Sequence, residues 1–329
     1  MAIERLLDTS RSAKLQGGEL PMLITHEAED ENDGCAFASE RRDVLLDALH
    51  CRGALLLRGF QLAGIEELAE FAEILGGKLM SYMDRAAHRT HLKGQVYTAA
   101  DYPPTHEIHL HNESTYAQNW PTKLFLHCLH PAQEGGQTPI ADVRKVLSRL
   151  RAETIRAFAD RGVMYVRNFG VARFGPTWQA AFQTDRREEV DAYCLESDIR
   201  AEWVDEDRLR TTQTRPALLT HPQTGEEVWF NHAATLHVSS LPARTRRVLM
   251  KLLDESDYPS HTYYGDGAPI EPEVLDEVRD AYDAERVLIE WKAGDVLVLD
   301  NILTAHGRLP FKGHREVVVA MTGASAWRR

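Results

Sequence analysis

His111 and Glu113 are the residue pair with the clearest chemical potential, because they lie one residue apart within the stretch 106–142. In an extended strand, residues i and i+2 project to the same face, so this imidazole and carboxylate could bind one metal ion from a single strand. Two protein ligands are too few for a tight site, so a third must come from elsewhere in the chain. His306, in the C-terminal stretch LDNILTAHGRLPF, is the best candidate.

Two histidines and one carboxylate on one side of a metal, with other positions open, are typical of non-haem Fe(II) sites. The tripeptide His-x-Glu is weak evidence by itself, since a chain with 15 His and 50 acidic residues forms it easily by chance. His109 lies on the same predicted strand face as His111, and we interpret it as a hydrogen-bonded strand residue in preference to a ligand. A metal role for the trio therefore needs support from the surrounding sequence.

Length and composition allow one large domain or two ordinary ones, since 43% of the 329 residues are hydrophobic. A net charge of −12 argues against a nucleic-acid-binding face. The N-terminal sequence lacks the apolar core of a signal peptide, and no apolar run approaches the length of a membrane span. Cys35, Cys51, Cys128 and Cys194 show no paired spacing, which predicts ordinary buried, free thiols in a reducing, cytoplasmic compartment.

Hydrophobic periodicity predicts the elements that must position these residues. We expect helices at 40–50, 65–75, 143–150, 152–160, 185–195, 242–253 and 272–283. We expect strands at 54–60, 95–99, 124–131, 137–141 and 164–169, and two more joined by a turn at 222–225. Segments 286–291 and 295–301 flank Lys292-Ala293-Gly294, which predicts a hairpin, and 315–323 is the expected final strand.

Together these elements predict a single domain over 1–329 that is mainly β with helices (α+β). Glu113 and His306 are 193 residues apart (306 minus 113), so both halves of the chain must share one core. We expect a double-stranded β-helix (jelly-roll, cupin-like) core at about 96–142 and 210–329, with flanking helices. A helical and strand region is expected at about 1–95, and a mainly helical insert at about 143–209.

A set of motifs in fixed order carries a family resemblance: HNESTY, LFLHCLHPAQEGGQTPIAD, YVRNFG, HPQTGEEVWFN, LDN, HGRLPF and GHREVVVA. From about residue 55 to the C-terminus, the chain resembles the taurine dioxygenase-like (clavaminate synthase-like) Fe(II)/2-oxoglutarate-dependent oxygenases. Within them, it is most similar to syringomycin-type aspartyl and amino-acid hydroxylases of natural-product pathways. The co-occurrence of the motifs is far more specific than any one of them.

The resemblance implies roles for individual residues. His111, Glu113 and His306 match the family's iron ligands. Arg315, nine residues after His306, matches the arginine that pairs with the distal carboxylate of 2-oxoglutarate, and Thr138 matches a threonine that hydrogen-bonds the same carboxylate. The chemistry agrees with this assignment, because a planar guanidinium can bind a carboxylate with two parallel hydrogen bonds.

The implied activity is that of a dioxygenase that uses Fe(II), 2-oxoglutarate and O2 to hydroxylate an unactivated C–H bond. The implied substrate is an amino acid or an amino-acid derivative, free or presented by a peptidyl carrier protein, with no nucleic acid and no membrane as partner. Desaturation or cyclisation on the same scaffold is an alternative. Two further alternatives are a zinc or manganese enzyme, against which Thr138 and Arg315 argue, and a non-catalytic binding protein, against which the intact trio argues.

Two departures from the family pattern affect this interpretation. Glu113 stands where many relatives have aspartate and where related halogenases have a small residue, so the resemblance implies hydroxylation and not halogenation. Ala87-His88-Arg89 stands where close relatives carry Thr-Pro-Arg, so a substrate role is not carried over to this loop.

Several other residues near the motifs are interpreted as structural. We expect Asn112 to brace the ligand loop, and Arg308 to hold a loop in preference to binding a second anion. The large aromatic residues Trp178, Phe182 and Trp229 are expected in the core. Asn231 and His232 follow a strand predicted to run beside the metal, where a substrate contact is the alternative to a structural role.

Overall fold

The structure, a computed structural model, describes residues 13–16, 20–26, 33–80, 91–93, 95–99, 102–171 and 174–327. Its helices are α2 (Gly34–Glu40), α3 (Arg42–Arg52), α4 (Ile65–Gly76), α5 (Val143–Arg149), α6 (Ala152–Arg161), α7 (Trp178–Phe182), α8 (Arg187–Glu196), α9 (Ala233–Leu236), α10 (Ala243–Leu252) and α11 (Pro272–Ala284), with short 3-10 turns at Val238–Ser240 and Glu255–Asp257. Within the described ranges, none of these helices is long and apolar enough to span a membrane.

Over the described residues, the strands form one eight-stranded sheet, two four-stranded sheets and two two-stranded ribbons. They are β1 (Ala13–Gln16), β2 (Met22–His26), β3 (Ala54–Arg58), β4 (His91–Lys93), β5 (Val96–Thr98), β6 (Ile108–His111), β7 (Asn119–His130), β8 (Glu134–Gly135), β9 (Thr138–Asp142), β10 (Val163–Phe169), β11 (Arg200–Trp203), β12 (Leu209–Arg215), β13 (Leu218–Thr220), β14 (Glu227–Trp229), β15 (Ser260–Tyr264), β16 (Val287–Ile289), β17 (Val296–Asp300), β18 (Thr304–Arg308), β19 (Phe311–Lys312) and β20 (Glu316–Ala326).

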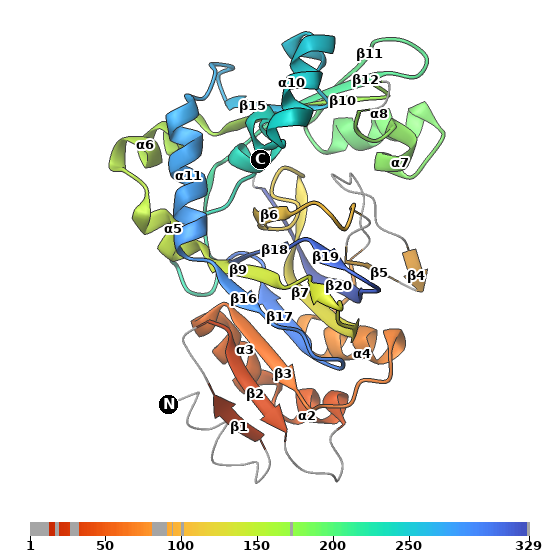
Figure 1. Ribbon diagram of the computed structural model, residues 1–329, viewed down its shortest axis with the longest axis vertical. Helices are drawn as coiled ribbons and strands as arrows, with labels where there is room; N and C mark the ends of the chain where they lie inside the picture. The colour runs from red at the N-terminus through yellow and green to blue at the C-terminus, as the bar shows by residue number, and fades with distance from the viewer. Residues whose placement is uncertain are drawn as a thin grey trace.

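The largest sheet has the order β1-β2-β3-β17-β7-β20-β5-β4, and among its described strands β2 and β3 are the one parallel pair. Helices α2, α3 and α4 lie beside it at the N-terminal end of the molecule (Figure 1). Its central strands are continuous apolar runs, such as VLVLD in β17, because a strand covered on both faces needs apolar side chains on both. Alternate residues of these strands therefore reach two different cores.

One face of this sheet packs against the helices and the other packs against a second sheet. Val296 and Val298 of β17 belong to the apolar cluster that includes the buried residues of α3 and α4, while Leu297 and Leu299 belong to a separate cluster. That cluster includes Ile140 of the second sheet, whose strand order is β16-β9-β18-β6. The two sheets therefore lie face to face with apolar side chains between them.

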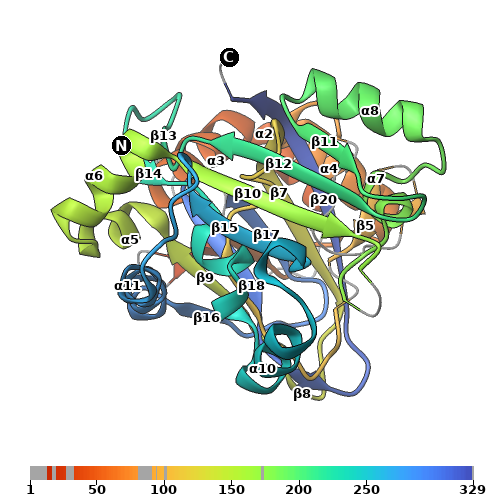
Figure 2. The ribbon, with the colours of Figure 1, turned by 90° about the horizontal axis from the view of Figure 1, so that it is seen from above.

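The third sheet, β11-β12-β10-β15, lies at the opposite end of the molecule from the N-terminal helices (Figure 1). Seen from above, it has α8 at one side and α11 at the other (Figure 2). It is built from Val163–Phe169, Arg200–Trp203, Leu209–Arg215 and Ser260–Tyr264. The insert expected to be mainly helical at about 143–209 thus contains α5 to α8 but also β10, β11 and the start of β12.

Many of the elements expected from periodicity are confirmed, including α3, α4, α5, α6, α10, α11, β3, β5, β7, β9, β10 and β20. The prediction of β-rich structure mixed with helices is also confirmed. The four cysteines are free, as expected, and Cys35, Cys128 and Cys194 are buried. Cys51 is exposed, so the expectation of a buried thiol is wrong for this residue.

The hairpin predicted around Lys292-Ala293-Gly294 is wrong. Strand β16 pairs with β9 in the second sheet, whereas β17 pairs with β3 and β7 in the first. Because β16 and β17 pair with strands of different sheets, the short connection between them carries the chain from the second sheet to the first. Asp295 fixes this connection, since its carboxylate binds both Arg58 of β3 and the backbone N–H of Lys292.

Arg58→Met should lower the free energy of unfolding by about 2–4 kcal/mol, because Asp295 would remain as a buried carboxylate without its guanidinium partner. Asp295 is 1% exposed, and two hydrogen bonds of 2.8 and 2.6 Å join it to Arg58. The matched control is Arg186→Met, which removes an exposed pair with Glu189 and should cost less than about 1 kcal/mol. Urea unfolding followed by circular dichroism measures both, and equal effects would contradict the prediction.

Candidate metal centre

His111, Glu113 and His306 come together although 193 residues (306 minus 113) separate the last two in sequence. One ligand atom of each residue lies within 4.8 Å of the others. His306 Nε2 is 3.8 Å from Glu113 Oε2, and the two imidazole rings have centroids 4.6 Å apart. His109, the competing histidine, is exposed and is not part of this cluster.

The second sheet places the two histidines directly opposite one another. His306 of β18 is the register partner of His111 of β6 on one side and of Ile140 of β9 on the other. Register partners project to the same face of a sheet, and Ile140 belongs to the core between the two sheets. The cluster therefore lies on the sheet face that looks into the interior of the molecule.

A backbone carbonyl orients the His111 ring. Its Nδ1 lies 2.8 Å from the carbonyl oxygen of His109, which can only accept a hydrogen bond. The proton must then be on Nδ1, so Nε2 keeps its lone pair for a metal ion. This is the usual arrangement for a histidine ligand, in which a second group fixes the tautomer.

Glu113 is not placed by the strand, contrary to the expectation from the i, i+2 spacing. Strand β6 ends at His111, and Glu113 lies in the turn that follows. Its position is set by the fully buried side chain of Asn301, which accepts a hydrogen bond from Glu113 N at 2.7 Å and donates one to Glu113 O at 3.0 Å. The Asn301 amide also donates to the carbonyl of Pro121, and Asn112 Nδ2 donates to the Asn301 carbonyl. The expected bracing role of Asn112 is thus confirmed.

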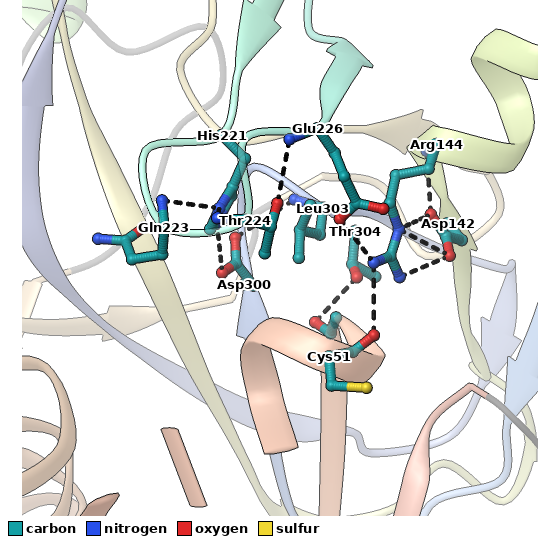
Figure 3. A network of polar contacts seen from close by, with 11 residues as sticks. Cys51, Asp142, Arg144, His221, Gln223, Thr224, Glu226, Asp300, Leu303 and Thr304 are labelled. Atoms are coloured by element: carbon teal, nitrogen blue, oxygen red, sulfur yellow. Dashed lines mark hydrogen bonds and ion pairs between the residues drawn. The ribbon is translucent and has the colours of Figure 1, made fainter. Parts of the chain in front are cut away.

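The turn from β17 into β18 is held by the polar network in Figure 3. Asp300 Oδ1 accepts a hydrogen bond from the backbone N–H of Ile302 at 2.9 Å, and Oδ2 lies 3.0 Å from His221 Nε2. The hydroxyl of Thr304 donates to the carbonyl of Gly53, at the end of α3. These buried contacts fix the start of β18 and, with it, the strand that carries the C-terminal histidine of the cluster.

Thr138 lies on the same sheet face as the cluster. It is two residues before Ile140 on β9, and residues i and i+2 of a strand share a face. Strand geometry puts its Cα roughly 8 Å from that of His306. The Thr138 hydroxyl accepts a hydrogen bond from Trp291 Nε1 at 3.0 Å, so its own proton remains available for an acceptor.

Arg315 is a half-buried cation in the loop immediately before β20. Its Nε donates to the carbonyl of Gly136 at 3.1 Å, and its guanidinium carbon lies 5.7 Å from the centre of the Phe311 ring. Burial lowers the Arg315 pKa to about 10, and the nearby charge of Arg308 acts in the same direction. Across the described residues, no carboxylate pairs with Arg315 and its terminal amino groups make no hydrogen bond. The group is therefore suited to receive an anion from outside the chain.

Gly136 leaves room for this arginine. Its φ is +72°, and a Cβ atom there would lie 3.1 Å from Arg315 Cδ and 2.9 Å from the Ala132 side chain. Any other residue would be strained in this conformation and would push the arginine away.

His232 is a neighbour that the sequence indicated only loosely. Its ring centroid lies 5.5 Å from that of His111, and its Nδ1 is 2.5 Å from the Thr115 hydroxyl. Its backbone N–H donates to the hydroxyl of Tyr165. Complete burial lowers the pKa of His232 to about 3, with the charge of His111 next in importance, so the imidazole stays neutral.

Two contributors were missed by sequence reasoning. Asn301 was noted only as part of the LDN motif, although an asparagine directly after a buried apolar strand signals a side chain with a hydrogen-bonding role. Trp291, which holds the Thr138 hydroxyl, carries no comparable signal in the sequence.

The remaining residues singled out earlier are structural. Arg308 donates to the backbone carbonyls of Tyr102, Pro103 and His106, which confirms its loop-holding role. Asn231 bonds only the backbone of its neighbours in the described contacts, through Ala217 O and Ala233 N. The aromatic residues expected in the core are buried there: Trp178, Phe182 and Trp229. The run 87–89 lies outside the described residues.

The donor set fits a divalent iron ion. Two imidazoles and one carboxylate converge from one side, and their ligand atoms are close enough to share one ion. Glu113 and His306 are 3% and 7% exposed, so these ligands would shield one side of a bound ion from bulk water.

Comparisons with known proteins agree with this arrangement. Residues 19–321 match the family described as "Taurine catabolism dioxygenase TauD, TfdA family". The chain is 36% identical to the dapdiamide synthesis protein DdaC of Enterobacter agglomerans, over 91% of this chain and 90% of that one. It is 27% identical to a clavaminate synthase-like protein of Arabidopsis thaliana, over 85% and 84%.

Among solved structures, the fold is similar to that of PvcB from Pseudomonas aeruginosa, described as an Fe, alpha-ketoglutarate dependent oxygenase from an isonitrile synthetic pathway. The TM-score is 0.52 at 16% identity, covering 91% of this chain and 84% of that one. This likeness concerns the fold alone, because the sequence identity is low.

Asn301→Ala should lower the free energy of unfolding by about 2–4 kcal/mol, because the buried backbone N–H and carbonyl of Glu113 and the carbonyl of Pro121 lose their hydrogen bonds to the Asn301 side chain. The matched control is Asn119→Ala, an exposed asparagine at the start of β7. Urea unfolding of the metal-free proteins measures the difference. Similar stabilities for the two variants would show that the turn carrying Glu113 is held by other contacts.

Proposed function

The chain belongs to the TauD, TfdA family and is an Fe(II)- and 2-oxoglutarate-dependent oxygenase, and from this premise we propose that it hydroxylates a C–H bond of an amino acid or amino-acid derivative. The convergence of His111, Glu113 and His306 on one interior sheet face is the observation that supports this function most directly. The name of the DdaC relative supports a place in natural-product biosynthesis.

We assign the two face-to-face sheets to a double-stranded β-helix within one domain of the whole chain. The packing of alternate residues of β17 toward two different cores supports this assignment. In this view, residues 143–209 are an insert that builds the third sheet together with the rest of β12 and with β15. The site then occupies the interior of the barrel-like core, where ligands of such folds are enclosed.

His111, Glu113 and His306 are proposed to hold Fe(II) from one side. When bound, the iron supplies the activation of dioxygen and the oxidation of the substrate. The protein contributes the geometry: the carbonyl of His109 fixes the His111 tautomer, and Asn301 fixes the backbone of Glu113. A neutral His232 beside His111 avoids adding a positive charge next to a metal cation.

Arg315 and Thr138 are proposed to bind the distal carboxylate of 2-oxoglutarate. Arg315 supports this role because no carboxylate of the described residues pairs with it, and its terminal amino groups match the two oxygens of a carboxylate. The Thr138 hydroxyl, already accepting from Trp291, has one proton to donate. Together they would orient the co-substrate toward the metal.

Glu113 bears on the type of reaction. A carboxylate at this position occupies a site that a small residue would leave open to a halide ion. Hydroxylation is therefore proposed in preference to halogenation. Desaturation or cyclisation would require the site to hold the substrate in a position where it does not receive the hydroxyl group.

His306→Ala should reduce turnover by more than about 100-fold, since losing a ligand should cost more than the 10–100-fold typical of losing a supporting group. His106→Ala, an exposed histidine five residues before His111, is the matched control and should keep its activity. The readout besides activity is the weak visible absorption band formed when Fe(II) and 2-oxoglutarate are added without oxygen. Retention of that band in His306→Ala would rule out His306 as a ligand.

Arg315→Ala should raise the KM for 2-oxoglutarate at least about 30-fold, equivalent to about 2 kcal/mol, because the carboxylate would lose its charged partner. Lys312→Ala serves as the control, since it removes a nearby but exposed cation. Succinate formation as a function of 2-oxoglutarate concentration gives both values. An unchanged KM in Arg315→Ala would place the carboxylate elsewhere.

Product analysis tests the reaction type. With Fe(II), 2-oxoglutarate, oxygen and excess chloride, mass spectrometry should show a gain of one oxygen atom on a free or carrier-bound amino acid. The substrate is found by screening both forms for succinate release. A chlorinated product, or succinate without any modified amino acid across the screen, would contradict the proposal, and loss of two hydrogens would indicate desaturation.

A further inference from the structure

We propose that His130, His314 and Glu316 form a second metal site, on the surface of the protein, that binds a divalent transition-metal ion of the zinc type. One ligand atom of each residue lies within 4.8 Å of the others. Among the described residues, this is the one group besides His111, Glu113 and His306 in which at least three such side chains meet in this way.

The distances already approach those of a coordinated ion. His130 Nδ1 lies 3.3 Å from Glu316 Oε2, and His314 Nε2 lies 3.6 Å from the same oxygen. Ligands bound to zinc at about 2.0–2.1 Å in a tetrahedral arrangement lie roughly 3.3–3.5 Å apart. Small side-chain rotations are therefore enough to bring the three donors onto one ion, without movement of the backbone.

The scaffold holds these residues in place. His130 is the last residue of β7, Glu316 is the first residue of β20, and the two are register partners in the long β7–β20 pair. His314 lies in the loop two residues before Glu316, and its Nε2 is 3.6 Å from Glu316 Oε2. Arg315 lies between them and bonds Gly136, which keeps it out of the proposed site.

The exposure of the donors distinguishes this site from the interior one. The side chains of His130, His314 and Glu316 are 63%, 70% and 38% exposed. An ion can thus enter from solvent and keep water on its remaining position. Two imidazoles and a carboxylate suit zinc, nickel or copper better than calcium or magnesium, which prefer oxygen ligands alone.

Zinc stoichiometry of untagged, dialysed protein tests the site. With zinc supplied at a small excess over two equivalents, wild type should retain about two ions per chain, and His314→Ala and His306→Ala about one each. The double variant should retain none. His106→Ala, which alters an exposed histidine of neither cluster, should retain two. These counts do not depend on the oxygenase activity.

Cobalt(II) and thermal unfolding give independent readouts. In the His306→Ala protein, cobalt should produce a visible band typical of four-coordinate nitrogen and oxygen ligation, and zinc should raise the Tm. Both effects should disappear on adding His130→Ala or His314→Gln, the latter retaining a polar side chain of similar size. If these variants bind zinc as well as the His306→Ala protein, or with an affinity reduced less than tenfold, then His130, His314 and Glu316 do not form a zinc site and the proposal is overturned.

Discussion

The buried amide of Asn301 is the contact on which the candidate metal centre depends. It bonds both the N–H and the carbonyl of Glu113 across a sequence separation of 188 residues, and it also donates to the carbonyl of Pro121. A turn outside any strand has no ladder of hydrogen bonds to fix it, so a side chain must supply them. His306 follows Asn301 by five residues, and the same short stretch therefore positions ligands from both halves of the chain.

The two face-to-face sheets explain how such a site can exist inside the molecule. Strands with consecutive apolar residues, such as Val296 to Leu299 of β17, use alternate side chains to cover the helices and the second sheet. The second sheet then needs apolar residues only where it meets the first. His111, His306 and Thr138 lie on that same interior face, at positions that the apolar packing does not use.

The partners of the buried arginines distinguish those with a structural role from Arg315, which is suited to bind an anionic ligand. Arg58 pairs with Asp295, and Arg144 pairs with Asp142 and Glu226, so burial is offset by a carboxylate of the protein. Arg315 is also half-buried, and burial lowers its pKa to about 10, yet its hydrogen bond among the described residues goes to a neutral carbonyl. A half-buried cation without a carboxylate partner among the described residues would be stabilised by an anion from solution, such as a dicarboxylate co-substrate.

The sequence determined the identity of the ligand candidates, most helices and many strands, because residue types and their periodicity are local properties. It could not determine which strands pair, and so the predicted hairpin at 292–294 proved to be a crossing between two sheets. It also attributed the placement of Glu113 to strand alternation, whereas Asn301 performs that task. Only the tertiary structure brought His130 opposite Glu316 and His232 beside His111, since pairing between distant segments depends on the packing of the whole core and not on any one segment.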